Sequence, residues 1–332
     1  MAEPGIADVM ICDRLRQRDA VESRAEVISS LRESPRRIPS RLFYDSRGSE
    51  LFEEITGLPE YYPTRTERSI LQRHSARLVG GPAGLNIVEL GSGDCSKVSI
   101  LLDAVPRECL PSTGYIPVDV SRSALTKSAR TLREAYPGLR IRCLRADFCR
   151  CMSMIPANGR KLVLFLGGTI GNLPESGAHR LLRGLAGSMG PDDRLLLGLD
   201  MLKDRDVLER AYNDSQGVTA EFNRNILRVT NRLLDSNFKP DQYVHRAFLN
   251  EEQSRVEMHL EASGPQRVSS PWLDDPLRIC RGERIHTENS RKYSPGDIER
   301  MADSAGLAVR DVLTDDRDWF SLAEMESVRA GA

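Results

Sequence analysis

The sequence lacks the features that mark a membrane, secreted or nucleic-acid-binding protein. No apolar stretch approaches the roughly 20 residues that a membrane helix needs, and the N-terminal segment has no basic region followed by an apolar core. Lysine plus arginine (47) and aspartate plus glutamate (48) nearly cancel, so the net charge is −1 and gives no indication of a nucleic-acid partner. We therefore expect a cytoplasmic protein that binds neither membranes nor nucleic acid.

Cysteine is present, but its spacing excludes a disulfide framework and a zinc knuckle. The chain has seven cysteines, an odd number, and only Cys149 and Cys151 lie close together. A zinc site would need a second Cys/His pair at ligand spacing, which the sequence lacks. We expect free thiols in a reducing compartment and no metal site.

A regular alternation of apolar strands and helices is present between residues 85 and 200. Strands are expected at 85–90, 115–120, 139–144, 161–166 and 194–199. Helices are expected between them at 97–103, 123–135 and 178–189. This alternation is typical of a doubly wound, Rossmann-like parallel α/β sheet.

The rhythm stops after Asp200, and the following segment has a different character. One long helical stretch up to residue 234 precedes alternating, strand-like pieces, which indicates an inserted α+β lobe. A helix capped by Ser294 and stopped by Gly306 follows, and then a strand pair. The expected division is a flexible tail at 1–13, a sheet domain at 65–202 and 292–332, and a second lobe at 14–64 and 203–291.

Two helix starts are predicted upstream of the sheet domain. Ser49 is placed to cap a short helix that runs through Ile55. Thr64 and Glu67 have the spacing of a capping box for the next helix.

The stretch IVELGSGDCSK, residues 87–97, runs from a strand through Gly-x-Gly into a helix. A dinucleotide fingerprint would continue to a third glycine or alanine, but Ser96 stands there and Glu89 lies just before the turn. A Walker A lysine pattern is absent. S-adenosylmethionine, a sulfonium without phosphate, suits this polarity better. Asp119 could then accept both ribose hydroxyls, and Asp147 with Phe148 could hold the adenine; helix capping is the alternative for each acid.

Four strings together resemble the histidine Nα-methyltransferases of ergothioneine biosynthesis. They are FYDSRGSELFEEITGLPEYYPTRTE, VELGSGDCSK, FLGGTIGNL and YNDSQGVTAEFNRN, and the resemblance runs from about Pro35 to the C-terminus. It implies a class I methyltransferase sheet that binds S-adenosylmethionine, with a substrate-binding lobe. It also implies that free L-histidine is the acceptor and is methylated three times to hercynine. We expect a monomer whose partner is a small-molecule substrate.

The resemblance implies roles for individual residues. The donor-binding positions are Tyr44, Gly91, Lys97, Asp119, Asp147 and Phe148. The acceptor-binding positions are Phe52, Tyr61, Gly167, Asn172, Tyr212, Met258, Glu288 and Ser290. Of the acceptor set, Asn172 and Tyr212 would hold the α-carboxylate and amine, and Tyr61, Glu288 and Ser290 would bond the imidazole. The catalytic candidates are Tyr44, Asn172 and Tyr212.

The residue types suit methyl transfer, in which positioning of nitrogen and methyl should dominate. The nucleophile must be a neutral amine, and a desolvated α-amino group can lose its proton without a strong base. Tyr44, through a water molecule, is a candidate relay. Glu288 and Ser290 alternate on an expected strand and would share one face.

Other interpretations remain open at this point. Asn172 could instead cap a helix, and Glu288 with Ser290 could lie on a solvated hairpin face. The protein could methylate another aromatic amino acid or related amine. It could also be a nicotinamide-dependent oxidoreductase or a non-catalytic donor-binding regulator.

Overall fold

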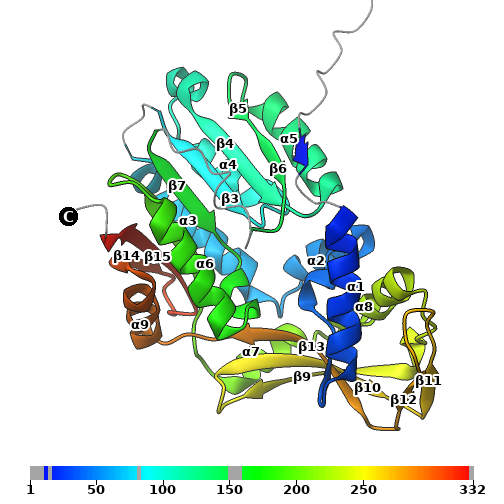
Figure 1. Cartoon of the computed structure of the whole chain (residues 1–332). Coiled ribbons are helices and arrows are strands. Elements are labelled where there is room, and N and C mark those ends of the chain that lie inside the picture. Colours follow the sequence, from blue (N-terminus) through cyan, green and yellow to red (C-terminus); the bar gives the residue numbers. More distant parts are fainter. Residues whose placement is uncertain (1–10, 14–16, 81–83, 149–158, 329–332) are drawn as a thin grey trace, which may run out of the picture.

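The computed structural model describes residues 11–13, 17–80, 84–148 and 159–328. Cys149 and Cys151 lie outside these residues. Among the described residues, five cysteines are free thiols: Cys12, Cys95, Cys109, Cys143 and Cys280. The chain folds into a large sheet with helices on both faces and a smaller sheet to one side (Figure 1).

The central sheet has the strand order β1-β6-β4-β3-β7-β8-β15-β14, with β5 paired to β4. Its strands are β1 (Ile11–Asp13), β3 (Asn86–Leu90), β4 (Gly114–Asp119), β5 (Arg140–Ile141), β6 (Cys143–Arg145), β7 (Lys161–Phe165), β8 (Arg194–Asp200), β14 (Leu307–Thr314) and β15 (Phe320–Ser327). The strands from β1 to β8 pair in parallel, whereas β15 is antiparallel to both of its neighbours. The predicted doubly wound sheet is confirmed.

Side-chain alternation along the strands explains why helices cover both faces of this sheet. Val88 and Leu90 pack with α6 (Glu175–Ser188) and α9 (Pro295–Ala305), whereas Ile87 packs with the other group of helices. That group consists of α3 (Tyr62–Val79), α4 (Ser96–Leu102) and α5 (Arg122–Ala135). The buried strands therefore hold the loops at their carboxyl ends in fixed positions.

The second lobe is built on a four-stranded sheet of order β2-β13-β10-β9. Its strands are β2 (Arg36–Arg37), β9 (Tyr243–Asn250), β10 (Arg255–Ala262) and β13 (Arg284–Arg291), and a hairpin of β11 (Gln266–Val268) and β12 (Leu277–Ile279) adjoins them. The helices of the lobe are α1 (Gln17–Arg32), α2 (Ser46–Thr56), α7 (Arg205–Tyr212) and α8 (Val218–Leu234). The described residues also form the short 3-10 turns η1 (Ser40–Phe43), η2 (Arg107–Ser112), η5 (Thr169–Asn172) and η6 (Pro240–Gln242).

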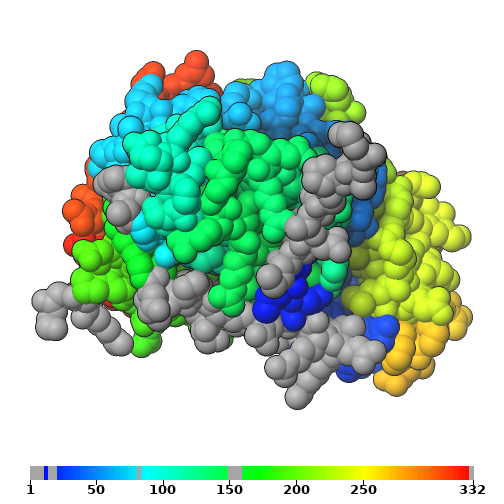
Figure 2. Space-filling view, turned by 90° about the horizontal axis from the view of Figure 1, so that it is seen from above, coloured from blue at the N-terminus to red at the C-terminus, as the bar shows by residue number. Residues whose placement is uncertain are grey.

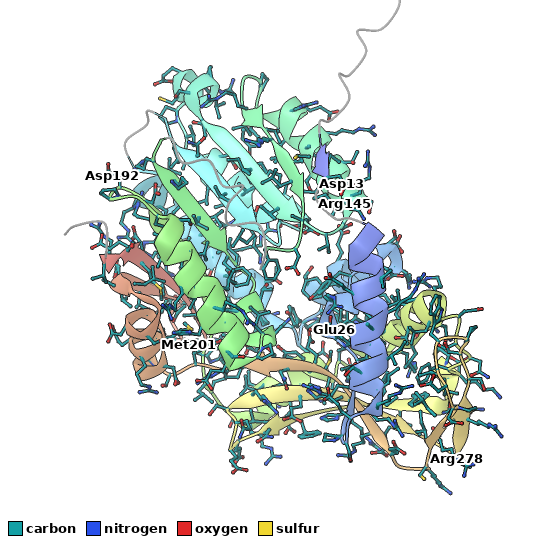
Figure 3. All side chains as sticks on the ribbon, viewed as in Figure 1. Asp13, Glu26, Arg145, Asp192, Met201 and Arg278 are labelled. Atoms are coloured by element: carbon teal, nitrogen blue, oxygen red, sulfur yellow. The ribbon has the colours of Figure 1, made fainter. Side chains whose placement is uncertain are left out.

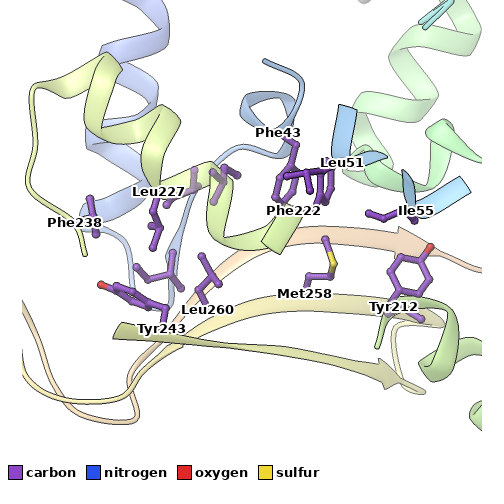
Figure 4. Packing of buried hydrophobic residues seen from close by; sticks show 14 of the residues in the cluster. Phe43, Leu51, Ile55, Tyr212, Phe222, Leu227, Phe238, Tyr243, Met258 and Leu260 are labelled. Carbon is purple, nitrogen blue, oxygen red and sulfur yellow. The ribbon is translucent and has the colours of Figure 1, made fainter. Parts of the chain in front are cut away.

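An apolar core of its own holds this lobe together. Phe43 stacks on Phe222 of α8 with 4.5 Å between ring centroids, and Met258 and Leu260 project from β10 toward them (Figure 4). In the space-filling view, the yellow and orange residues of this lobe gather at one side of the molecule (Figure 2). The lobe and the central sheet thus have separate hydrophobic cores.

Three boundary predictions are wrong. Ile11–Asp13 were expected in a flexible tail but form β1 beside β6, where Asp13 lies 2.9 Å from Arg145 (Figure 3). The stretch 139–144 is split into two short strands, β5 and β6. The long helix ending at 234 is two helices, because Asp214 accepts hydrogen bonds from the N–H groups of Val218 and Thr219 and starts α8 anew.

Helix capping was predicted correctly at one end of the chain and incorrectly at the other. Ser294 and Asp297 form the capping box of α9, and Gly306 ends the helix with a φ of +76°. The cap of α2 is Asp45 rather than Ser49, because the Asp45 side chain accepts from the N–H of Gly48. None of the described helices is long and apolar enough to cross a bilayer.

The capping box of α9 gives a direct test of helix stabilisation. Ser294→Ala removes the acceptor of the Asp297 N–H, so we expect the free energy of unfolding to fall by about 1 kcal/mol. Urea denaturation measures this difference. The control, Ser304→Ala, changes an exposed serine inside the same helix and should have an effect near zero. Equal effects of the two substitutions would contradict the capping assignment.

Candidate active site

The carboxyl ends of the parallel strands β3, β4, β6 and β7 lie along one edge of the central sheet. A Cβ on Gly91, whose φ is +69°, would lie 3.9 Å from Cε1 of Phe148. The Phe148 ring also packs on Phe165 at the end of β7, with 5.2 Å between ring centroids. The glycine turn therefore leaves its backbone open to a ligand beside an aromatic ring.

Asp119, at the end of β4, is oriented by the same turn. Its Oδ2 accepts a hydrogen bond from the N–H of Gly93 (2.9 Å), and its Oδ1 accepts one from the N–H of Ser121 (2.8 Å). Burial raises the pKa of Asp119, and these backbone hydrogen bonds oppose the rise. Each oxygen keeps acceptor capacity for a ligand hydroxyl. Asp147 lies half-buried just before Phe148 on the loop after β6.

Glu89 does not supply the negative charge that the sequence analysis expected beside the turn. It is only 3% exposed, and its Oε2 accepts a hydrogen bond from the Tyr115 hydroxyl at 2.6 Å. Burial raises the pKa of Glu89 to about 8, so the carboxyl is mostly protonated at neutral pH. Glu89 is therefore a buried neutral group that is hydrogen-bonded to Tyr115.

Lys97, predicted to bind the donor, is paired with a carboxylate that the prediction missed. Its Nζ lies 2.5 Å from Oε2 of Glu67, which is fully buried, and Oε1 of Glu67 accepts a hydrogen bond from the N–H of Gly167 at 2.8 Å. A Cβ on Gly167 would lie 3.2 Å from Lys97 Nζ. Glu67 thus ties α3 to α4 and to the turn after β7.

The capping-box role predicted for Glu67 is wrong. Helix α3 begins at Tyr62, and Glu67 lies inside it on the face that also buries Ile70 and Leu71. The absence of a side chain on Gly198 makes room for it, because a Cβ there would lie 2.4 Å from Glu67 Oε1. The sequence did contain a signal for the burial of Glu67, because it lies at helical spacing from the apolar residues Ile70 and Leu71.

Four aromatic rings from four separate segments form one wall of the site. Tyr44 meets Phe52 edge to face at 5.8 Å, Phe52 meets Tyr61 at 6.2 Å, and Tyr61 meets Tyr212 at 6.4 Å. Met258 is buried on β10 in the same apolar cluster, and Figure 4 shows it between Leu260 and Tyr212. Tyr44, predicted to bind the donor, is therefore brought together with four predicted acceptor-binding residues that are distant in sequence: Phe52, Tyr61, Tyr212 and Met258.

Asn172 and Glu288 form a direct contact between the two sheets at the site. Asn172, at the end of η5 after β7, donates from Nδ2 to Oε1 of Glu288 on β13 at 3.1 Å. The turn approaches β13 closely because Gly171 has no side chain; a Cβ there would lie 2.9 Å from the Arg291 carbonyl oxygen. The alternative helix-cap role for Asn172 is wrong, because α6 is capped at Pro174.

A β-bulge explains how Glu288 comes to face the site. The pairing of β10 and β13 shifts between Met258 and His259, where Met258 faces Glu288 but His259 faces His286. Thr287 is the additional residue, and its hydroxyl lies 2.7 Å from Oδ1 of Asn223. Bulges re-aim side chains, so Glu288 and Ser290 both turn inward and are each 7% exposed. Their predicted common face is confirmed, and the solvated-face alternative is wrong.

A buried ionic cluster under Tyr212 was also missed. Asp200, at the end of β8, contacts Lys203 Nζ at 2.6 Å and Lys292 Nζ at 2.7 Å and accepts a hydrogen bond from the Tyr62 hydroxyl. Although burial raises it, the two ammonium groups hold the pKa of Asp200 below its usual value. No local sequence pattern around Asp200, Lys203 or Lys292 indicates that these charged side chains contact one another.

Burial governs the protonation of the groups that face the pocket. It raises the pKa of Glu288 to about 8, against the opposing charge of Lys292. It also raises the pKa values of Tyr44, Tyr61 and Tyr212 well above their usual value, and the negative charge of Glu288 adds to this effect. The phenols therefore remain neutral and act as hydrogen-bond donors or acceptors.

The fold and the site together define a class I S-adenosylmethionine-dependent methyltransferase. The strand order with one inserted antiparallel strand, the open glycine turn beside Phe148 and the oriented carboxylate of Asp119 fit that donor. A family model described as "Histidine-specific methyltransferase, SAM-dependent" matches residues 23–327. The chain belongs to this family, which decides against a nicotinamide cofactor.

Named relatives agree with this assignment. A histidine N-alpha-methyltransferase of Mycobacterium tuberculosis (strain CDC 1551 / Oshkosh) is 42% identical over 300 residues, covering 90% of this chain and 93% of that protein. The protein of the same name from Mycolicibacterium smegmatis is 41% identical with the same coverage. Ergothioneine biosynthesis protein 1 of Neurospora crassa is 33% identical over 90% of this chain, which matches 34% of that protein.

The raised pKa of Glu288 predicts a pH-dependent effect of Glu288→Gln on stability. The folded protein keeps the carboxyl proton up to about pH 8, whereas the unfolded chain loses it above its ordinary pKa near 4.3. Wild-type stability therefore falls as pH rises through this window. We expect the variant to gain on the order of 3 kcal/mol relative to the wild type between pH 5 and pH 8. A constant difference in urea denaturation across this range would contradict the assignment.

Proposed function

We propose that the protein transfers three methyl groups in succession from S-adenosylmethionine to the α-amino group of free L-histidine, giving hercynine in ergothioneine biosynthesis. The names of the similar proteins support this activity. The observation that carries it is the Asn172–Glu288 contact, which sets an amide at the methyl-donor sheet beside a buried carboxylate of the second lobe. An amino acid with a polar ring can bind with its α-carbon end at Asn172 and its ring at Glu288.

The donor would be held at the carboxyl ends of the central strands. Gly91 leaves the backbone accessible, Asp119 would accept the ribose hydroxyls, and Asp147 with Phe148 would bind the adenine. When bound, S-adenosylmethionine supplies an electrophilic methyl group on a sulfonium. Lys97 is already engaged by Glu67, so we assign it the role of placing the Gly167 turn against the donor.

The acceptor would lie between this turn and the second lobe. Asn172 and Tyr212 would hold the α-carboxylate and amine. Tyr61, Glu288 and Ser290 would bond the imidazole, with Phe52 and Met258 as walls. The site needs no strong base, because a desolvated α-amine releases its proton near neutral pH. Tyr44 keeps its proton and would relay one only through a water molecule. Positioning is therefore the main contribution to the rate.

The segments 14–64 and 203–291 would form the substrate-binding lobe, and 65–202 with 292–332 the donor-binding domain. We further propose a monomeric, cytoplasmic enzyme. The free thiols among the described residues support a reducing compartment.

A mass-spectrometric assay tests the proposed reaction. The purified protein is incubated with S-adenosylmethionine and each of the twenty amino acids in turn. We expect histidine alone to gain mass, ending at three added methyl groups. Methylation of tryptophan or phenylalanine in preference to histidine would contradict the assigned acceptor, and no turnover with any amino acid would favour a donor-binding regulator.

Glu288→Ala tests how the acceptor is selected. Removing a buried carboxylate that pairs with an imidazole N–H should lower kcat/KM for histidine by about 100-fold and raise tolerance for phenylalanine. The matched control is Glu257→Ala, which removes a buried carboxylate from the other face of the same sheet. Unchanged histidine kinetics in Glu288→Ala, or an equal loss in Glu257→Ala, would refute the role of Glu288.

A further inference from the structure

Lys292 is the most completely buried charged group beside the acceptor pocket, with 0% exposure. Its ammonium group donates to three acceptors: Asp200 Oδ2 at 2.7 Å, Ser290 Oγ at 2.9 Å and the Tyr212 hydroxyl at 3.0 Å. An ammonium has three N–H donors, so this set satisfies all of them. Lys292 therefore contacts the two hydroxyls of the pocket without lining the pocket itself.

The backbone fixes Lys292 over Asp200. The chain just after β13 pairs with the end of β8, because the Tyr293 N–H donates to the Asp200 carbonyl at 2.9 Å and the Leu202 N–H donates to the Tyr293 carbonyl at 2.8 Å. Lys203 holds the other carboxylate oxygen of Asp200 and does not contact Tyr212 or Ser290 among its hydrogen bonds. Both lysines thus pair with the Asp200 carboxylate, but only Lys292 also donates to Tyr212 and Ser290.

The hydrogen bonds of Ser290 have a direction that Lys292 imposes. Ser290 Oγ accepts from Lys292 and from the Tyr212 hydroxyl at 2.7 Å. A hydroxyl has two acceptor lone pairs and one proton, so both lone pairs are occupied and only the proton remains. With the Tyr212 hydroxyl donating in this direction, the Ser290 proton is left for a ligand. Ser290 can therefore meet a ligand only as a donor.

We propose that Lys292, anchored by Asp200, is a positioning residue that makes Ser290 an obligate hydrogen-bond donor and keeps a positive charge beside Glu288. The acceptor pocket then presents a donor at Ser290 and, once Glu288 has lost its proton, an acceptor at Glu288, with the Tyr61 phenol as a further predicted imidazole partner. A neutral imidazole has one N–H and one free nitrogen lone pair, which complements this pair. Imidazolium and indole have no such lone pair. This assignment of the ligand class rests on the proposed function.

The charge of Lys292 also governs how readily Glu288 accepts. Lys292 is the group that lowers the pKa of Glu288 against the effect of burial. The other groups facing Glu288 are the amide of Asn172 and the phenols of Tyr44, Tyr61 and Tyr212, which stay neutral. Without Lys292, Glu288 should keep its proton to a higher pH and act less well as an acceptor.

The test compares Lys292→Met with Lys203→Met. Both remove one buried ammonium from Asp200 and leave it paired with the other, so their effects on stability should be similar. We expect Lys292→Met to raise KM for histidine at least tenfold, with the affinity for S-adenosylhomocysteine by calorimetry within twofold of wild type. Lys203→Met should change KM for histidine by less than twofold. An equal rise in KM for both variants would show a structural role only and overturn the proposal.

A double-mutant cycle and a pH series separate the two effects of Lys292. If Lys292 acts through Ser290, adding Lys292→Met to Ser290→Ala should raise KM for histidine by less than a further threefold. The ratio of histidine KM values between Lys292→Met and Lys203→Met should shrink as pH rises from 7 to 9, because Glu288 regains its charge. The proposal is overturned if the two substitutions multiply fully in their effects on KM and the KM ratio between Lys292→Met and Lys203→Met does not change with pH.

The test also covers a Lys292→Met variant that does not fold and a wild type that prefers another amino acid. If Lys292→Met does not fold, Lys292→Gln, which keeps N–H donors but has no charge, replaces it. This variant should raise KM for histidine by a smaller factor at pH 9 than at pH 7. If the wild type methylates another amino acid instead of histidine, the proposed function fails, and the same cycle is run with that amino acid. A Lys292 effect there equal to that of Lys203 would overturn the role of Lys292 separately.

Discussion

The close approach of the turn after β7 to strand β13 is the constraint on which the site depends. Gly171 allows the turn to touch the backbone at Arg291, and Asn172 then reaches Glu288 from the opposite sheet. Each sheet has its own apolar core, so neither could supply both halves of the site alone. This close approach, together with the backbone pairing of Tyr293 with Asp200 and Leu202, sets the distance between the donor and acceptor halves.

Buried charge fixes the remaining geometry of the site. Glu67 holds Lys97 and the Gly167 backbone on the donor side, and Asp200 holds Lys292 on the acceptor side. A buried ion pair is weak evidence for stability, because desolvation offsets its attraction. Breaking one is costly, however, so such pairs define a single arrangement. That property suits a reaction in which alignment of nitrogen and methyl dominates the rate.

Sequence patterns predicted what local periodicity determines. The parallel strands, the helix cap at Ser294 and the common face of Glu288 and Ser290 were predicted from the sequence, and the structure has them. The face of Glu288 also depends on a bulge at Thr287, which no spacing indicates. Glu67 and Lys292 were missed for the same reason: their partners lie 30 and 92 positions away, at Lys97 and Asp200. Their pairing is a consequence of the assembled fold.

The central claim is that the acceptor lies across the two sheets, with its α-carbon end at Asn172 and its ring at Glu288. A crystal structure with S-adenosylhomocysteine and histidine tests this most directly. The account predicts the α-amino nitrogen facing the sulfur and an imidazole nitrogen at roughly 2.6–3.2 Å from Glu288. A histidine bound with its ring toward the glycine turn at Gly91, or with its α-carboxylate on Glu288's side of the pocket, would contradict it.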